Sequence, residues 1–385
     1  MSESFNQKPI FSRVNQNDKP QERLIAFDIL KLVAMSYVLF GHVLQRWYVV
    51  NFTQTVGFSF FYSVSLAIFF FVGGFFVKKA TKITDLLLYL AKLFISYIVP
   101  AFLFTCLSIW LLPRFADHDF AYWMGELYYR TDTFYWFFLT AFFINAILGI
   151  GYYLTNLFFK ESSLIDDLLK TMFLVVFLVI FSSVFIYIYN ANDLGPGTLS
   201  ANMFLYYLPI AFLGLLLATF KKYFASLKKI KFLRITAFAI SSSIYIVGLW
   251  HYQNWLGGLN GSFNEIAWRM IIACAGVISY YYIALFVERF TIIQKVAKYA
   301  KYSGPFYLVH VFLIRLLATY LPRPEVFDNG TMLFIVFLTV GFYIGSLGIT
   351  MLMVDFPFTN LLFFGDYKSI KKIRRLFQKS ADNLN

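Results

Sequence analysis

Charged side chains are scarce in this sequence. Only 14% of the 385 residues are Asp, Glu, Lys or Arg, whereas 60% are hydrophobic and 22% are aromatic, and the mean hydropathy is +0.67. A soluble domain carries about 25% charged residues and could not keep this much apolar surface away from water. The composition therefore excludes a soluble globular protein and predicts an integral membrane protein.

Cysteine, signal-like segments and repeats are also rare or missing. The two cysteines, Cys106 and Cys274, lie inside apolar runs without the spacing of metal ligands, so we expect neither a metal site nor a structural disulfide. Residues 1–22 are polar and contain no apolar h-region, so we expect no cleavable signal peptide and assign insertion to the first helix. No repeat and no large polar block divides the chain, which predicts one membrane domain.

Long apolar runs are abundant, and a helix needs roughly 20 apolar residues to cross the hydrocarbon core. The predicted fold class is all-α, a polytopic integral membrane protein with about ten transmembrane helices. The ten segments lie at roughly 24–45, 56–77, 86–112, 133–157, 171–190, 203–220, 233–252, 264–287, 303–320 and 332–354. Pro100 is expected to kink the third. The predicted organisation is a disordered cytoplasmic tail at 1–22, a ten-helix domain at 23–356 and a basic cytoplasmic C-terminal tail at 357–385.

The distribution of Lys and Arg predicts the orientation. With the N-terminus inside, 25 of the 33 basic residues fall in cytoplasmic segments, and the outer loops hold only Arg46, Arg114, Arg130 and Arg323. Both termini are therefore predicted to be cytoplasmic in a multi-pass protein of the cell membrane. The net charge of +13 indicates topology and attraction to anionic inner-leaflet lipid, and no nucleic-acid partner is expected. The basic segment 221–234 is interpreted in the same way, as a topology determinant.

Three ionisable residues mark the first helix. Lys31 and His42 are 11 residues apart, which places them on one face of a helix, roughly 16 Å apart along its axis. Asp28 lies one turn before Lys31 and is placed to pair with it. Ionisable groups within a membrane are costly and indicate function. Snorkelling or an internal ion pair for Lys31, and a packed or interfacial histidine for His42, remain the structural alternatives.

The stretch from Asp28 to His42 resembles the first-helix signature of the membrane acyltransferase family 3, a basic residue followed ten residues later by histidine. Four other segments are similar to family motifs in the same order, at Phe69–Phe76, Tyr135–Phe138, Tyr207–Gly214 and Ser303–His310. The resemblance covers roughly residues 24–356. Lys31 stands where arginine is more usual, and no C-terminal hydrolase-like domain follows.

The resemblance implies an O-acyltransferase that uses cytoplasmic acyl-CoA, usually acetyl-CoA, as its donor and needs no metal. The acceptor it implies is a hydroxyl of an extracytoplasmic polysaccharide or of a lipid-linked glycan. On this reading Lys31 binds a CoA phosphate, Asp28 orients Lys31, and the pantetheine arm threads along the helix towards His42. His42 either deprotonates the acceptor hydroxyl or carries the acyl group as an acyl-imidazole, and both routes stay open.

Other intramembrane residues, together with Trp123 of the outer loop 113–132, complete the candidate set. His310 is a second candidate catalytic residue, or else a satisfied core histidine, and Arg315 is a candidate donor-binding residue. A helix turns these two about 140° apart, so they need not act together. Glu265, Arg269 and Trp123 are candidates for acceptor binding near the outer surface, although Glu265 and Arg269 also have the spacing of an ion pair.

Two competing functions have the same helix count. A transporter or flippase for a small solute or a lipid-linked sugar would also carry central polar groups, although the paired broken helices of repeat-built transporters are not found. A non-catalytic partner of a glycan synthase would tolerate substitution of Lys31 and His42.

Overall fold

The structure is a computed structural model of the chain. It describes residues 24–47, 56–111, 119, 121–123, 136–159, 163–191, 201–227, 231–251, 263–321, 329–366 and 368–382. The predicted tail at 1–22 lies outside the described residues, as does most of the segment 113–132.

The described residues form helices and no strand. The helices that build the bundle are α1 (Ile25–Trp47), α2 (Val56–Phe75), α3 (Ile83–Leu93), α4 (Val99–Leu111), α6 (Trp136–Phe158), α7 (Leu164–Ala191), α8 (Ala201–Leu227), α9 (Lys231–His251), α10 (Phe263–Val287), α11 (Thr291–Ala297), α12 (Ser303–Leu317) and α13 (Asn329–Asp355). All ten segments predicted to cross the membrane are helical, with α3 and α4 sharing the third.

Eight spans of the described chain are long and apolar enough to cross a membrane, and the molecule is an all-α polytopic membrane protein. Of the other two predicted spans, α12 has only 15 residues, whereas α2 has 20 residues and is apolar over Ser59–Phe75. Both are central helices that pack against α1. A helix enclosed by protein can be shorter than one that faces lipid along its whole length, because its ends are covered by neighbours.

The third span changes its helical form in the middle. Between α3 and α4 the chain forms a π-helix, η3 (Phe94–Ile98), in which the N–H of Val99 reaches back to the carbonyl of Phe94. Pro100 follows directly and has no N–H to donate, so the regular α-helical hydrogen bonds cannot continue through this turn. The predicted irregularity at Pro100 is therefore a π-helical turn that precedes the proline.

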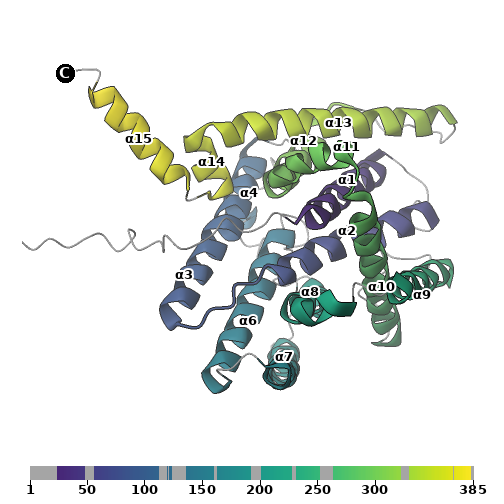
Figure 1. The fold of residues 1–385 in the computed structure, drawn as a ribbon. Helices are drawn as coiled ribbons and strands as arrows, with labels where there is room; N and C mark the ends of the chain where they lie inside the picture. Colours follow the sequence, from purple (N-terminus) through teal and green to yellow (C-terminus); the bar gives the residue numbers. More distant parts are fainter. Residues whose placement is uncertain are drawn as a thin grey trace, which may run out of the picture.

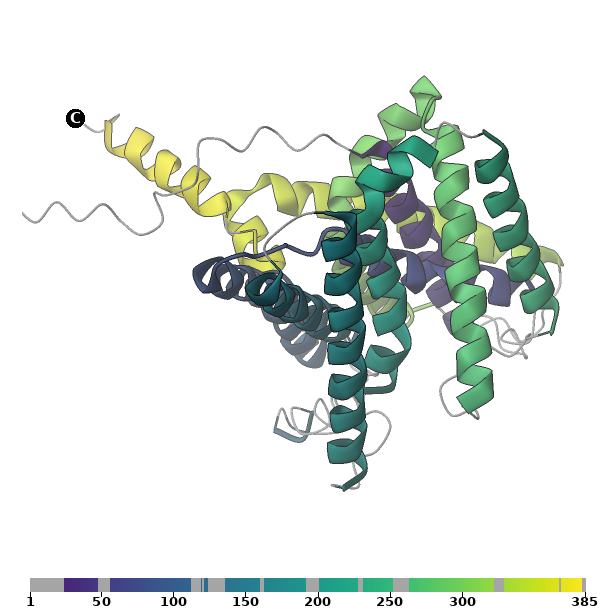
Figure 2. The same ribbon diagram turned by 60° about the horizontal axis from the view of Figure 1, so that its bottom comes forward.

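Helix α1 lies at the centre of the bundle. It packs against α2, α10, α12 and α13, and the apolar core is arranged around it (Figures 1 and 2). Behind α1, α2 and α8 come together very closely. A Cβ atom on Gly74 would lie 1.8 Å from the carbonyl oxygen of Ala211, and one on Gly214 would lie 1.9 Å from that of Phe71. Only glycine permits this backbone contact, which holds α2 against α8.

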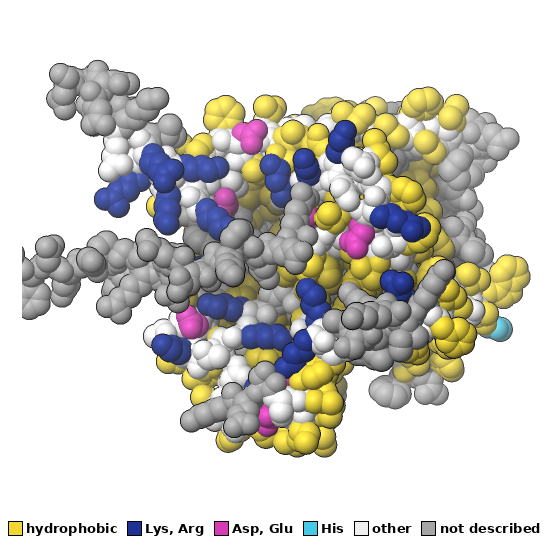
Figure 3. All heavy atoms as spheres, viewed as in Figure 1, with side chains coloured by type: hydrophobic (Ala, Val, Ile, Leu, Met, Phe, Trp, Pro, Cys, Tyr) yellow, Lys and Arg dark blue, Asp and Glu magenta, His cyan; other side chains and the backbone are white. Residues whose placement is uncertain are grey.

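The helix ends predicted to be cytoplasmic lie together. Asp167, at the start of α7, accepts from Lys222 at the end of α8, with Nζ and oxygen 2.9 Å apart. Glu288, after α10, accepts from the N–H of Ala26 at the start of α1, at 3.1 Å. Figure 3 shows a face of the molecule on which Lys and Arg side chains are numerous. This arrangement agrees with the alternation of loops that the Lys/Arg bias predicts.

The region predicted as a basic tail contains two helices, α14 (Pro357–Phe364) and α15 (Ser369–Asp382). Gly365 joins them in a left-handed conformation with φ of 63°. A Cβ atom at this position would also meet the carbonyl oxygen of Ile95 at 2.0 Å, so the turn packs directly on the π-helix. Phe364 stacks on Phe104 of α4, which docks α14 against the bundle.

Candidate functional site

Two imidazoles meet inside the bundle. His42 of α1 and His310 of α12 have ring centroids 5.6 Å apart and planes inclined by 35°. His42 is partly exposed, whereas His310 is only 1% exposed. The ring of His310 stacks on Phe306 at 5.3 Å and meets the edge of Tyr307 at 5.2 Å. Both histidines predicted to be catalytic therefore belong to one cluster.

Their hydrogen bonds define which nitrogen of each ring is basic. His310 Nδ1 lies 2.9 Å from the carbonyl oxygen of Phe306, which can only accept, so Nδ1 carries the proton. His42 Nδ1 lies 3.1 Å from Oε1 of Gln45 and is protonated for the same reason. In both rings Nε2 then carries a lone pair. His310 Nε2 is buried and has no hydrogen-bond partner among the described residues.

Such a pair can perform proton transfer. A neutral imidazole with a free Nε2 can accept a proton from a hydroxyl or attack a carbonyl carbon. A buried polar atom without a partner costs about 1–3 kcal/mol, so the Nε2 of His310 is not explained by stability. Arg315 joins the cluster through an electrostatic interaction with His42. The helix turns Arg315 and His310 about 140° apart, yet His310 meets the ring of His42 and Arg315 interacts with it electrostatically.

We call the face of α1 that carries Lys31 and His42 the stripe. At the end of the stripe opposite His42, Lys31 forms the expected ion pair with Asp28. The Nζ and Oδ1 atoms are 3.0 Å apart, and the side chains are 25% and 13% exposed. The ammonium also lies 5.9 Å from the ring centroid of Phe76, at the end of α2. The lysine is thus held by a carboxylate and an aromatic ring and keeps contact with solvent.

The passage expected between Lys31 and His42 is closed in this structure. Met35 and Val38 occupy the same stripe of α1 and are 2% and 7% exposed. These side chains pack into the apolar cores on either side of α1. A slender ligand can reach His42 from Lys31 only if Met35 and Val38 rearrange.

The three candidates for acceptor binding are less well placed by the structure. Arg269 is 7% exposed, and its backbone carbonyl accepts a 3.4 Å hydrogen bond from the hydroxyl of Tyr206 in α8. Trp123 is partly exposed beside Tyr122, with ring centroids 5.3 Å apart. The side chain of Glu265 lies outside the described residues. A role at the acceptor entrance stays a prediction for all three.

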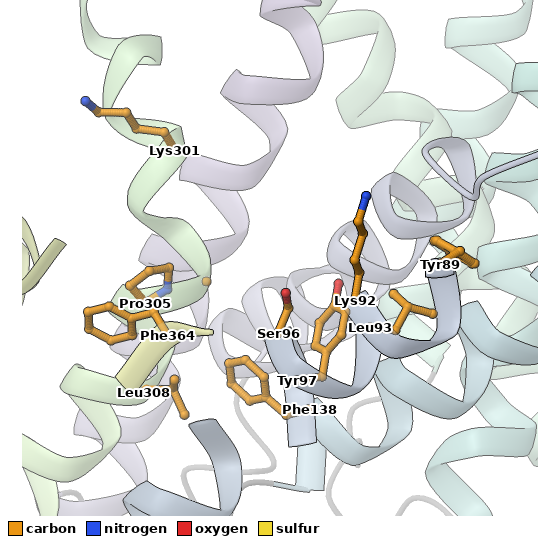
Figure 4. Close-up of a pocket in the computed structure, with 11 residues that line it drawn as sticks. Tyr89, Lys92, Leu93, Ser96, Tyr97, Phe138, Lys301, Pro305, Leu308 and Phe364 are labelled. Carbon is orange, nitrogen blue, oxygen red and sulfur yellow. The ribbon is translucent and has the colours of Figure 1, made fainter. Parts of the chain in front are cut away.

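One cavity of 480 Å³ opens between η3 and the start of α12 (Figure 4). Lys92, Ser96 and Tyr97 form one wall in this view, and Pro305, Leu308 and Phe364 form the other. Lys301 lies at its rim, with Nζ 4.6 Å from the ring centroid of Tyr302. The cavity thus has an apolar interior and basic residues at its edge.

A second cavity, of 490 Å³, lies where the ends of α2 and α8 meet the start of α1. Its lining comprises Leu24, Phe75, Phe76, Val77, Lys78, Lys79, Ala218 and Lys221. Phe76 belongs both to this lining and to the surroundings of Lys31. We call it the three-lysine cavity.

Sequence reasoning missed Gln45 and the lysines of the two cavities. Gln45 follows His42 by three residues, which is the spacing of neighbours on a helix, so this signal was available. Lys78, Lys79, Lys221 and Lys301 were expected only to determine topology, and Lys92 was expected to lie within a membrane span. Nothing in their local sequence shows that Lys78, Lys79 and Lys221 meet, because Lys221 comes from a distant helix.

The family model described as an acyltransferase domain, of acyltransferase type 3, matches residues 24–351. The chain belongs to the membrane acyltransferase family 3. The match spans most of the 385 residues and contains α1 and α12, which carry the two histidines. No curated protein and no solved structure shows significant similarity to this acyltransferase. Its general activity is transfer of an acyl group within a multi-pass membrane protein.

Proposed function

We propose that this acyltransferase moves an acyl group, most simply acetyl, from cytoplasmic acyl-CoA to a hydroxyl of an extracytoplasmic polysaccharide or lipid-linked glycan. The observation that supports it best is the pair of His42 and His310, with an Nε2 lone pair in each ring, inside a membrane bundle of an acyltransferase family. A CoA thioester is charged and does not cross lipid, whereas the acceptor is exposed outside. A reactive site within the bundle can receive the donor from the cytoplasmic side and the acceptor from the outer side.

His42 is the proposed general base. Its Nε2 takes the proton from the acceptor hydroxyl while the hydroxyl oxygen attacks the thioester carbonyl carbon. The new C–O bond forms, the C–S bond breaks, and the proton passes to the departing CoA sulfur. In the alternative route Nε2 itself attacks the carbonyl, CoA leaves as the thiol, and the acyl-imidazole is then transferred to the hydroxyl. The protonated Nδ1 of His42 is compatible with both routes.

The other residues assist His42 or position the donor. His310 lies next to His42 and relays or shares its proton, and Arg315 favours negative charge near His42. Lys31 binds a donor phosphate as a point charge, and Asp28 holds its ammonium in place. The route from Lys31 to His42 is completed when Met35 and Val38 move aside, so donor entry is coupled to a local rearrangement of the core.

Replacement of His42 tests this function directly. His42→Ala should abolish acyl transfer to surface glycans, measured by mass spectrometry as loss of the mass of the acyl group from modified sugars. Ser36→Ala is the matched control on the same helix, where the Ser36 hydroxyl donates to the carbonyl of Leu32 and also hydrogen-bonds Tyr343. A His42→Ala strain with normal acylation would refute the catalytic role. Movement of a solute without consumption of acyl-CoA would instead favour a transporter.

A further inference from the structure

The three-lysine cavity carries an unusual concentration of positive charge. Lys78, Lys79 and Lys221 line it, and no acidic residue is present among the described residues of its lining. The rest of that lining is apolar, and the ring of Phe76 is 43% exposed. A basic segment whose only role is to fix the topology has no need of a cavity. The space of 490 Å³ lies within the range of small-molecule sites.

Lys79 is the best positioned of the three cations. Its Nζ donates to Oγ1 of Thr219 at 3.2 Å and lies 5.1 Å from the ring centroid of Tyr152. The backbone beside it is fixed because Asn156 donates to the carbonyl of Ala80 at 3.0 Å. These contacts hold the ammonium at the edge of the cavity without a carboxylate in direct contact.

Two acids lie near this region, and both pair with lysines. Asp85 Oδ1 lies 3.7 Å from Nζ of Lys78, one of the three cavity lysines. Asp167 is 5% exposed and accepts from Lys222 at 2.9 Å and from the hydroxyl of Tyr223 at 3.1 Å. The pKa of Lys79 is lowered by burial, and the charges of Lys222 and Lys170 lower it further, against the opposing effect of Asp167. The cluster therefore has excess positive charge that a bound anion would balance.

The cavity adjoins the donor-binding residue of α1. Phe76 forms part of its wall, and Lys31 approaches the same ring with its ammonium. An anion in the cavity would therefore be bound next to Lys31, at the point where the stripe towards His42 begins. The cavity beside η3 has two lysines in its lining and no such link to α1 among its described lining residues.

We propose that the three-lysine cavity binds the phosphate groups of the acyl-CoA donor. This inference rests on the proposed function and assigns a location to the nucleotide end of the donor. Lys78, Lys79 and Lys221 act as point charges for phosphate, and the exposed ring of Phe76 offers a surface on which an adenine ring can stack. Lys31 receives the part of the donor that continues into the membrane.

Direct binding of CoA to the full-length protein tests the inference without relying on turnover. The protein is placed in nanodiscs of neutral lipid, and CoA affinity is measured by calorimetry. We expect Lys79→Gln to weaken binding about fivefold and the Lys78→Gln, Lys79→Gln, Lys221→Gln triple variant to weaken it more than about twentyfold. Lys79→Arg, which keeps the positive charge, should retain most of the CoA affinity that Lys79→Gln loses. Lys82→Gln is the matched control, an exposed lysine beyond the cavity, and should bind like the unmodified protein.

Two further ligands identify what the cavity recognises. Dephospho-CoA, which lacks the 3′-phosphate, should bind more weakly than CoA to the unmodified protein and equally weakly to the triple variant. Anionic nanodiscs distinguish a lipid headgroup as the source of phosphate. If the triple variant loses bound anionic lipid but keeps its CoA affinity, the cavity is a lipid site and the inference is overturned.

The outcomes also separate this inference from the proposed function. A triple variant that unfolds at the normal temperature, binds CoA normally and transfers acyl groups overturns the assignment of the cavity only. An unmodified protein that binds CoA through the three lysines but transfers no acyl group leaves the assignment intact and refutes the proposed function.

Discussion

Replacement of His310 by phenylalanine separates a chemical role from a structural one. The ring of His310 is 1% exposed and already stacks on an aromatic neighbour, Phe306, so a phenyl ring fits the surroundings in kind. The substitution removes the hydrogen bond from Nδ1 to the Phe306 carbonyl, at a cost of about 1 kcal/mol. It also removes the buried Nε2 that has no partner among the described residues, which gains a similar amount.

The two effects nearly cancel, so His310→Phe should unfold within a few degrees of the unmodified protein. Activity should behave differently. Loss of a group that relays a proton lowers the rate by about 10²–10⁴-fold, equivalent to about 3–5 kcal/mol of barrier. The variant is thus expected to be stable and nearly inactive, a combination that a packing role does not produce.

The assay follows acyl transfer by the purified protein in liposomes, with acyl-CoA inside and acceptor outside, alongside thermal unfolding. His251→Phe is the control, since His251 is an exposed histidine at the end of α9. Transfer by His310→Phe within about twofold of normal would show that His310 is only a core residue. A large drop in unfolding temperature would contradict the stability reasoning.

Three further predictions follow from particular contacts. Lys31→Arg should retain acyl transfer. In steady-state kinetics, Lys31→Gln should raise the KM for acyl-CoA about fivefold and change kcat less. A fall in kcat as large as the rise in KM would contradict a donor-anchoring role. Gly74→Ala should destabilise the bundle by about 1–3 kcal/mol, because its Cβ would lie 1.8 Å from the carbonyl oxygen of Ala211. Gly341→Ala is the control and should not destabilise it, because the added atom would have open space around it. Equal unfolding temperatures for the two variants would refute this prediction. The pKa of Lys79 is lowered, so this lysine loses its charge below the ordinary lysine value of 10.5, and CoA affinity should fall as pH rises through that pKa. Arginine stays charged over this range, so Lys79→Arg should remove the pH dependence. An unchanged pH profile in that variant would contradict this reasoning.

Much of the fold is encoded locally. The ten apolar segments follow from their length and hydropathy, because the backbone of any segment that crosses lipid must satisfy its own hydrogen bonds and therefore forms a helix. The pairing of Asp28 with Lys31 follows from a three-residue spacing within one helix. The irregularity near Pro100 was predictable, since proline lacks a donor, but neither its π-helical form at Phe94–Ile98 nor its contact with the turn of Gly365 was.

The sequence alone determined that this protein is a helical membrane bundle whose first helix carries a cation and an imidazole on one face, because both properties depend on residues that are near one another in the chain. Tertiary structure alone decided that His310 faces His42, that Met35 and Val38 are buried against other helices, and that three lysines share a cavity. These contacts join helices far apart in sequence, and hydropathy specifies only that a helix crosses the membrane. Which helices become neighbours is set by packing, as at the close contact of Gly74 with Ala211.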